Sequence, residues 1–358
     1  MAANAVETVD RTALDALREG VAGVLVEQSG STAIHAFIDG KRALDRELWQ
    51  QAAVLGWLAV GIPERHGGLG LGARGLAILH GELGRQATPG PYIATLAAAE
   101  TIAACGDEAG QQRYLPRIAG GEISAAVPAD LSRATASGAL RCLGAPDAAL
   151  LVAQTAEGWA LFELASAEVS EVPIWDRTRT VIEVKLGTAK PAATLDRRAG
   201  DTLLRAMTLA IAADSAGAAR SITERTIAYM KTREQFGQPI AGFQALKHRA
   251  ADLVTKLAVM DELVAHAVER IEAGEPDADL WAMLAKAEST EAFAFIATDC
   301  TQLHGGVGFT WDFDPHIFLK RARLNEALAT PNPALRDRAA AIMAEMARAE
   351  RTALELAL

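Results

Sequence analysis

Apolar residues recur at steps of three and four along most of the chain, which is the period of helices with one buried face. The first stripe of this kind consists of Leu14, Leu17, Val21, Val24 and Leu25. Further helical runs cover residues 44–58, 76–83 and 93–105, separated by the glycine-rich segment GIPERHGGLGLG and the turn ATPGPY. The pattern therefore predicts an N-terminal helical domain over residues 1–121.

A second pattern begins after residue 121. The segments AALLVAQ, GWALFEL and VIEVKL are short, rich in β-branched or aromatic residues, and bounded by Gly, Pro or Asp. Such segments are typical of strands. They predict a β-domain over residues 122–198, which is small for a domain of this class.

Helical periodicity returns from residue 199 and continues to residue 358. Apolar positions from Leu246 to Ile271 alternate steps of four and three, which predicts one long helix with a buried face, suited to a bundle. The segment EAGEPDADL turns it into another helix from about Asp279, the segment HGGVGFTWDFDP breaks that helix, and a last helix follows from Ala334. The predicted fold is mainly α with a small central β-domain.

Composition narrows the class of protein. The 358 residues are half apolar and 22% charged, as in globular chains, and the net charge of −10 argues against a nucleic-acid surface. No apolar run reaches membrane-spanning length, and the N-terminus lacks the apolar core of a signal peptide. Cys105, Cys142 and Cys300 are odd in number and far apart, which predicts buried free thiols in a reducing cytoplasm.

Two motifs favour a structural interpretation over a functional one. Residues Gly70–Gly75 match the dinucleotide fingerprint, but a helix and a proline loop precede them where that fingerprint needs a strand, so they are predicted to be an interhelical turn. Asp312, Asp314 and His316 are possible hard-metal ligands, but no second ligand motif supports them. The better interpretation is a solvated loop, and no metal site is predicted.

The segment TREQFGQPIAGFQ lies between two predicted helices and carries more chemistry than a helix turn requires. Arg233 offers a rigid fork of donors suited to a pair of phosphates. Gln235 and Gln244 add neutral hydrogen-bonding groups, and Phe236 adds a flat apolar face.

The segment QLHGGVGF is the second candidate. Its paired glycines, Gly305 and Gly306, let a backbone come close to a ligand, and Gln302 brings an amide. Together the two segments predict a helical site for a large, phosphate-bearing aromatic molecule.

At these residues the chain resembles the acyl-CoA dehydrogenase family of flavoproteins over nearly its whole length. The stretches that carry the resemblance are LWQQAAVLGWLAVGIPERHGGLGLG, GELGR, QQRYLPRIAGGE, KTREQFGQPIAGFQALKHRAADL and QLHGGVGF. The resemblance implies an N-terminal helical domain, a central β-domain and a C-terminal four-helix bundle. It also implies FAD bound across a dimer interface, with the flavin ring in one subunit and the distal half of the cofactor held by the neighbour. The residues that match this distal grip are Arg233, Gln235, Phe236, Gln244, Gln302, Gly305 and Gly306.

The departures from the family concern the reacting half of the site. Removing the α-proton of the thioester needs a carboxylate base. One family position for it falls near Thr330 and the other near Met207, and neither residue can accept the proton. The nearest carboxylate, Glu326, is about one helical turn away from the first position. The central segment AVPADLSRATASGALRCLG also lacks the motifs that contact the flavin ring in the family, so no catalytic residue is predicted.

This combination indicates a division of labour between two chains. The family includes heteromeric (α₂β₂) enzymes of bacterial steroid side-chain degradation, and GFTWDFDPHIFLKRA is similar to a stretch of their shorter members. The resemblance then implies an acyl-CoA substrate, a second acyl-CoA dehydrogenase-like subunit that supplies the flavin pocket and the base, and an electron-transferring flavoprotein as acceptor. Two alternatives stay open: a self-sufficient homo-oligomer with a displaced base, Glu326 or Asp312, and a flavin-free scaffold protein.

Overall fold

The computed structural model describes residues 11–40, 44–135 and 138–357. The N-terminal helices are α1 Arg11–Gln28, α2 Ser31–Asp39, α3 Arg46–Val54, α4 Gly72–Arg85, α5 Tyr92–Cys105 and α6 Glu108–Ala119. The predicted helical runs are confirmed as α1, α3, α4 and α5. The pattern does not predict α2, which has only nine residues, or α6, which is polar and contains Pro116. Side-chain caps help to start two of these helices, since Asp45 accepts from the Leu48 amide and Asp107 from the Gly110 amide.

The central sheet has seven strands in the order β5-β6-β2-β1-β3-β4-β7. Their bounds are β1 Ala125–Pro128, β2 Ala139–Leu143, β3 Leu150–Thr155, β4 Gly158–Glu163, β5 Glu168–Val172, β6 Val181–Lys185 and β7 Ala193–Thr194. β1 and β3 are parallel, and the other pairs are antiparallel, with Val152 opposite Leu161 in the β3–β4 hairpin. The three predicted strands are confirmed as β3, β4 and β6. The others escape the pattern because they are short, like β1, or polar, like β5.

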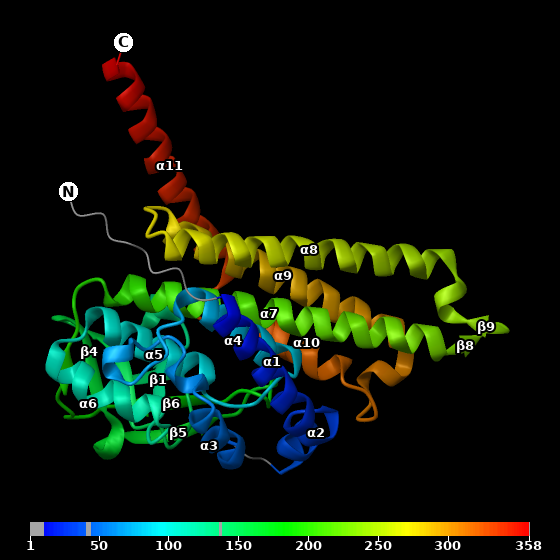
Figure 1. Cartoon of the computed structure of the whole chain (residues 1–358), viewed down its shortest axis with the longest axis horizontal. Coiled ribbons are helices and arrows are strands. Elements are labelled where there is room, and N and C mark those ends of the chain that lie inside the picture. Colours follow the sequence, from blue (N-terminus) through cyan, green and yellow to red (C-terminus); the bar gives the residue numbers. More distant parts are fainter. Residues whose placement is uncertain (1–10, 41–43, 136–137, 358) are drawn as a thin grey trace.

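The C-terminal part consists of α7 Ala199–Thr232, α8 Gln244–Glu272, α9 Ala278–His304, α10 Pro315–Ala327 and α11 Asn332–Ala357. Figure 1 shows α7, α8 and α9 lying side by side, with a small hairpin projecting beyond one end of the bundle and α11 leaving it near the other end. The predicted stripe on α8 is confirmed, with Leu253, Leu257 and Met260 buried. The fold is thus mainly α with a central sheet, as expected.

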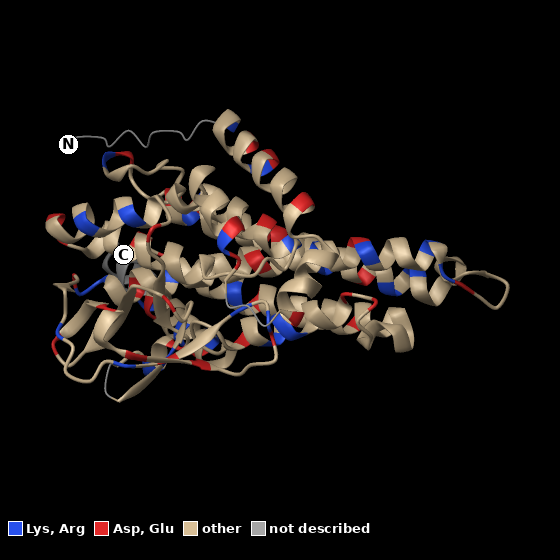
Figure 2. Ribbon diagram, turned by 90° about the horizontal axis from the view of Figure 1, so that it is seen from below, with Lys and Arg blue, Asp and Glu red and all other residues tan. Residues whose placement is uncertain are grey.

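One of the hydrophobic clusters spans both the helical and the sheet regions. Tyr114 of α6, Val127 of β1 and Leu203 of α7 belong to the same buried cluster. The three cysteines are buried and free, as predicted. In the view of Figure 2, basic and acidic residues are interspersed along the helices. No helix among the described residues is long and apolar enough to cross a bilayer.

The segment that links α9 to α10 differs from its prediction. Asp314 and His316 are buried, at 8% and 3% exposure, so the expectation of a solvated loop is wrong for both and holds only for the exposed Asp312. Asp314 is instead held by a hydrogen bond with His35 and an ion pair with Arg225. Across the described ranges, no group of three or more His, Cys, Asp or Glu side chains is placed to hold a metal ion. The predicted interhelical turn is confirmed only for Gly70 and Leu71, because Gly72–Gly75 already belong to α4; Gly70 and Gly72 both have positive φ.

Helices α4 and α7 cross with their backbones in contact, and glycine makes this possible. A Cβ added at Gly217 would lie 1.9 Å from the carbonyl oxygen of Gly81, and one added at Gly84 would lie 2.1 Å from that of Asp214. Neither obstacle is a side chain that can move aside. The separation of the two helices therefore depends on these positions.

Gly217→Ala is expected to lower the free energy of unfolding by about 1–3 kcal/mol, the usual cost of overpacking a rigid contact. Urea unfolding of the purified variant measures this loss. The matched control is Gly23→Ala on the exposed face of α1, where an added Cβ meets nothing within 4 Å. Alanine there is expected to be neutral or stabilising, so equal behaviour of the two variants would contradict the proposed close packing.

Candidate functional site

The segment after α7 forms a tight hairpin at the end of the bundle. Arg233 ends α7 with extended backbone angles, and strands β8 Glu234–Gln235 and β9 Gln238–Pro239 follow, with Gln235 opposite Gln238. The two turn residues, Phe236 and Gly237, have φ values of 54° and 80°. Positive φ at both central residues is the mark of a type I′ turn, whose twist matches paired strands.

Phe236 is an unusual residue for this turn. A left-handed conformation costs an ordinary residue about 1–2 kcal/mol, and Asn or Gly is the common choice. Its ring is 93% exposed and touches the protein through an edge-on contact with Phe243, with 6.2 Å between centroids. Folding of the isolated chain gains little from this side chain, so both the strain and the exposure favour a role in binding.

Phe236→Asn is expected to raise the free energy of unfolding of the isolated chain by up to about 1 kcal/mol, because Asn tolerates positive φ. Chemical denaturation measures the gain. Phe309→Asn serves as the control, since Phe309 is 68% exposed and is not among the residues with positive φ. A loss of stability in Phe236→Asn beyond that of Phe309→Asn would show that the ring supports the fold.

Aromatic contacts bring the end of α9 to the end of α7. The rings of Tyr229 and His304 stack with centroids 4.3 Å apart, and Phe313 packs edge-on against both. Tyr229 precedes Arg233 by one turn of helix, and His304 directly precedes Gly305. The hairpin and the start of the α9–α10 segment therefore lie at the same end of the bundle (Figure 1).

This end of the molecule presents unengaged polar groups. Arg233, Gln244 and Gln302 are exposed, and their side chains make no hydrogen bond or ion pair with any described residue. A guanidinium fork and two amides are thus available to a ligand. These donors are of the kind that phosphate and ribose groups need.

The glycines of this end are not explained by packing inside the chain. A Cβ added at Gly305 or Gly306 would meet nothing within 4 Å, although Gly305 needs its positive φ of 66° to end α9. The backbone at Gly306 is therefore open to a molecule outside this chain. Together with the free donors, this open backbone is accessible at the residues for which the sequence predicts a cofactor grip.

The two positions that match the family's catalytic base, unlike the exposed donors, offer no group to a ligand. Met207 is fully buried among apolar residues, and the Thr330 hydroxyl donates to the carbonyl oxygen of Ala329. The carboxylate of Glu326 pairs with Arg323 at 3.1 Å. None of these residues presents a free carboxylate to a ligand.

The turn between α10 and α11 is also in direct contact with the β-domain. The Leu131 amide donates to the carbonyl oxygen of Ala329 over 2.6 Å, and Asp130 forms a parallel bridge to Ala329. Asp130 and Leu131 belong to the central segment that lacks the family's flavin-contacting motifs. Ala329 precedes Thr330, one of the two positions that match the family's catalytic base. In this chain the central segment and Ala329 meet through their backbones.

Lys286 fixes this turn from inside, and the sequence reading overlooked it. Its ammonium is fully buried and donates to the carbonyl oxygens of Glu326 and Thr330, both at 2.9 Å, and to Asn332 Oδ1 at 2.8 Å. Burial lowers the pKa of Lys286 to about 7, against the attraction of Glu326 and Asp130. The sequence does contain a signal for this buried lysine, because Lys286 lies within the apolar run WAMLAKA.

A buried ionic cluster joins the β-domain to the bundle. Asp214 of α7 accepts from Arg179 Nη2 at 2.8 Å, from Asn325 Nδ2 at 2.9 Å and from both ends of the Arg321 guanidinium. Burial alone would raise the pKa of Asp214, but the charges of Arg179 and Arg321 and the hydrogen bonds from Arg321 and Asn325 outweigh it and hold that pKa well below its usual range. The cluster is a structural joint, and Asp214 lies about five helical turns along α7 from Arg233.

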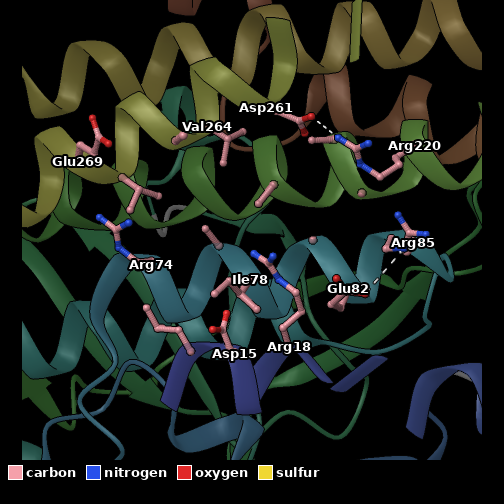
Figure 3. Close-up of a pocket in the computed structure, with 18 of the residues that line it drawn as sticks. Asp15, Arg18, Arg74, Ile78, Glu82, Arg85, Arg220, Asp261, Val264 and Glu269 are labelled. Carbon is pink, nitrogen blue, oxygen red and sulfur yellow. Dashed lines mark hydrogen bonds and ion pairs between the residues drawn. The ribbon is translucent and has the colours of Figure 1, made fainter. Parts of the chain in front are cut away.

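A separate cavity of about 690 Å³ lies between α1, α4, α7 and α8. Figure 3 shows Arg18 and Arg74 facing the space between α4 and α8, with acidic residues around them. Several of its charges are already paired, such as Arg220 with Asp261 and Arg85 with Glu224. None of the seven predicted cofactor residues lines it, so this cavity is distinct from the candidate site.

Comparison with known proteins places the chain in context. Residues 13–122 match the domain described as "Acyl-CoA dehydrogenase, N-terminal domain", and residues 199–344 match "Acyl-CoA dehydrogenase, C-terminal domain". The chain is 32% identical over 327 residues to acyl-CoA dehydrogenase IpdE2 of Mycobacterium tuberculosis, covering 89% of this chain and 94% of that protein.

Two solved structures share the architecture over 94% of this chain. A variant of the Tcur3481-Tcur3483 steroid ACAD superposes with a TM-score of 0.82 at 26% identity, covering 99% of that chain. The ChsE4-ChsE5 complex from Mycobacterium tuberculosis superposes with a TM-score of 0.83 at 24% identity, covering 98% of the matched chain. At that identity, the second likeness concerns the fold alone.

Proposed function

Because this chain belongs to the acyl-CoA dehydrogenase family of FAD-dependent oxidoreductases, we propose that it is the FAD-gripping subunit of a heteromeric member. In this proposal a second acyl-CoA dehydrogenase-like chain supplies the flavin pocket and the catalytic glutamate. The complex as a whole then carries out α,β-dehydrogenation of an acyl-CoA, and this chain alone is inactive.

The observation that carries the proposal is the contrast between the two halves of the expected site. The distal half is open, with Arg233, Gln244 and Gln302 unengaged and Gly306 accessible. At the reacting half, neither Met207 nor Thr330 offers a carboxylate, and the Leu131 amide bonds directly to Ala329. A chain that had lost the cofactor altogether would have no reason to keep the first half, and a self-sufficient enzyme would need the second.

The division of roles follows from the chemistry. Dehydrogenation removes a proton from the α-carbon and a hydride from the β-carbon, and FAD, when bound, supplies the acceptor for that hydride. A carboxylate must take the proton, and neither Met207 nor Thr330 can do so. The residues of this chain would then bind and orient FAD. The Arg233 fork would hold phosphate oxygens, and Phe236 would cover an apolar face of the cofactor. The amides of Gln235, Gln244 and Gln302 would fix the position of FAD by hydrogen bonds.

The substrate and the acceptor are proposed from the structural neighbours and from the family resemblance. The neighbour solved as a steroid ACAD, at 26% identity, supports a bulky acyl-CoA such as a steroid side-chain thioester. An electron-transferring flavoprotein as acceptor and a heterotetramer with two copies of each chain rest on family resemblance. Buried free thiols favour the reducing cytoplasm as the compartment.

Turnover of steroid acyl-CoA thioesters by the lone chain, by the partner alone and by the co-expressed complex tests this proposal. Activity is expected only from the complex. It should survive Glu326→Gln and Asp312→Asn in this chain and disappear when the partner's candidate glutamate becomes glutamine. Robust turnover by the lone chain, lost in either of those two variants, would establish the displaced-base alternative instead.

A further inference from the structure

The cavity between α1, α4, α7 and α8 has no role in the proposed reaction. Its volume of about 690 Å³ is within the range of small-molecule sites. Met207 and Thr330, the positions that match the family's base, do not line it, and neither do the residues of the predicted cofactor grip. The cavity is therefore available to a different ligand.

Small and apolar residues form the floor of this cavity. Helices α4 and α7 approach each other there, and both Gly81 and Gly217 line the cavity at this approach. The apolar side chains around the two glycines come from all four helices: Leu14, Ala77, Ile78, Ala213, Ala216, Val264 and Val268. An apolar molecule that covers this floor is stabilised by the surface it removes from water.

Three arginines from three helices gather at one end of the cavity, around Glu82. Burial raises the pKa of the Glu82 carboxyl. The charges of Arg85, Arg18 and Arg220 oppose this shift, so these guanidinium groups all lie near that carboxyl. Figure 3 shows Arg18 directed into the space between α4 and α8, at the same end as Glu82.

Arg18 is the arginine of this group that is not engaged. Arg85 pairs with Glu224 at 2.8 Å, and Arg220 pairs with Asp261. Arg18 is exposed, and its side chain makes no hydrogen bond or ion pair with any described residue. The cavity thus offers one unengaged guanidinium beside an apolar floor.

We propose that this cavity is an accessory site for an apolar carboxylic acid, whose carboxylate binds Arg18 and whose apolar body lies on the floor at Gly81 and Gly217. The planar guanidinium fork matches the two oxygens of a carboxylate. The inference does not depend on the proposed function.

The charges of the cavity favour a ligand with a single negative charge. Asp15 and Glu269 also line it, both are exposed, and neither side chain is paired with a described residue. A head group with several negative charges would meet these carboxylates as well as Arg18, and like charges brought together are costly. Phosphate esters and coenzyme A thioesters therefore fit less well than a carboxylate does.

Isothermal titration of the full-length chain with decanoate tests the inference. Saturable binding of decanoate is expected, and decan-1-ol, which has the same apolar chain without the charge, should bind at least about tenfold more weakly. Arg18→Ala should raise the dissociation constant for decanoate at least about tenfold, and Arg18→Lys should raise it less. Ala265→Trp places a large ring in the cavity from an exposed position of α8 and should abolish binding.

Arg141→Ala is the matched control, because Arg141 is exposed on β2 and does not line the cavity. Its affinity for decanoate should equal that of the wild type, and thermal unfolding checks that each variant folds. Wild-type affinity in either Arg18→Ala or Ala265→Trp would overturn the inference, as would absence of decanoate binding to the wild-type chain. Equal or tighter binding of decan-1-ol or decyl phosphate would overturn the carboxylate as the ligand. None of these outcomes changes the FAD content of the complex, on which the proposed function is tested separately.

Discussion

Asp214→Asn is expected to lower the free energy of unfolding by about 3–5 kcal/mol, the usual cost of breaking a buried ion pair. The substitution leaves Arg179 and Arg321 buried at 3% and 2% side-chain exposure without their shared counter-ion. Since the cluster joins the β-domain loop to α7 and α10, cooperative unfolding should shift as a whole. Urea denaturation at neutral pH, followed by circular dichroism, measures the change.

The pH dependence of this contribution has a defined sign. The folded pKa of Asp214 lies well below its usual range, so the unfolded chain takes up the proton first as the pH falls. The stabilisation is therefore complete above the unfolded pKa of about 4 and is lost as the pH falls toward the folded pKa.

A surface carboxylate provides the control for this variant. Asp147 pairs with Arg46 at 2.5 Å, with side-chain exposures of 45% and 73%. Asp147→Asn should change stability by no more than about 1 kcal/mol. Equal effects of Asp214→Asn and Asp147→Asn would show that the buried cluster is not the joint described above.

Arg233→Ala is expected to weaken FAD retention in the assembled complex by about ten- to hundredfold. The estimate follows from the 1.5–3 kcal/mol typical of hydrogen bonds to charged groups. Because the Arg233 side chain is exposed and makes no hydrogen bond or ion pair with any described residue, the stability of the lone chain should not change. Equilibrium dialysis of the complex against FAD-free buffer, followed by absorbance of the released flavin, measures the loss.

Two matched variants separate geometry from charge. Arg233→Lys keeps the positive charge but loses the planar fork, so its FAD affinity should fall between those of wild type and Arg233→Ala. Arg141→Ala removes an exposed arginine from strand β2 and should leave FAD retention unchanged. FAD retention by Arg233→Ala equal to that of Arg141→Ala would mean that the hairpin does not hold the cofactor.

The sequence predicted those helices and strands that a local pattern of residues along the chain can indicate. The α8 stripe and strands β3, β4 and β6 were found in this way. Helix α10 was not, because Arg321 and Asn325 interrupt the apolar residues of its inner face. Those residues are buried by partners more than 100 positions away, a separation that periodicity cannot report.

The candidate site shows the same limit. Residue types alone indicated that Arg233 and Gln302 suit a phosphate-bearing ligand, but their arrival at one end of the bundle depends on the stacking of Tyr229 on His304. The strained backbone of Phe236 is a property of the folded turn, and the three acceptors of Lys286 meet only when the α10–α11 turn has formed. The assignment of these residues to FAD remains a prediction.

The proposed division of roles predicts the cofactor content of the complex. If this chain contributes only the distal grip, each cofactor needs one chain of each kind, and the complex holds half as many FAD molecules as a homotetramer of equal size. Cofactor content then becomes a direct readout of the division of labour. It does not depend on knowing the acyl group.

The visible spectrum and native mass of the chain, purified alone and then co-expressed with its dehydrogenase-like partner, test this central claim most directly. We predict a colourless lone chain and a yellow mixed oligomer with one FAD for each pair of unlike chains. A yellow homo-oligomer with one FAD per chain would contradict the account, since it would require a complete flavin pocket in this chain despite the contact between Leu131 and Ala329.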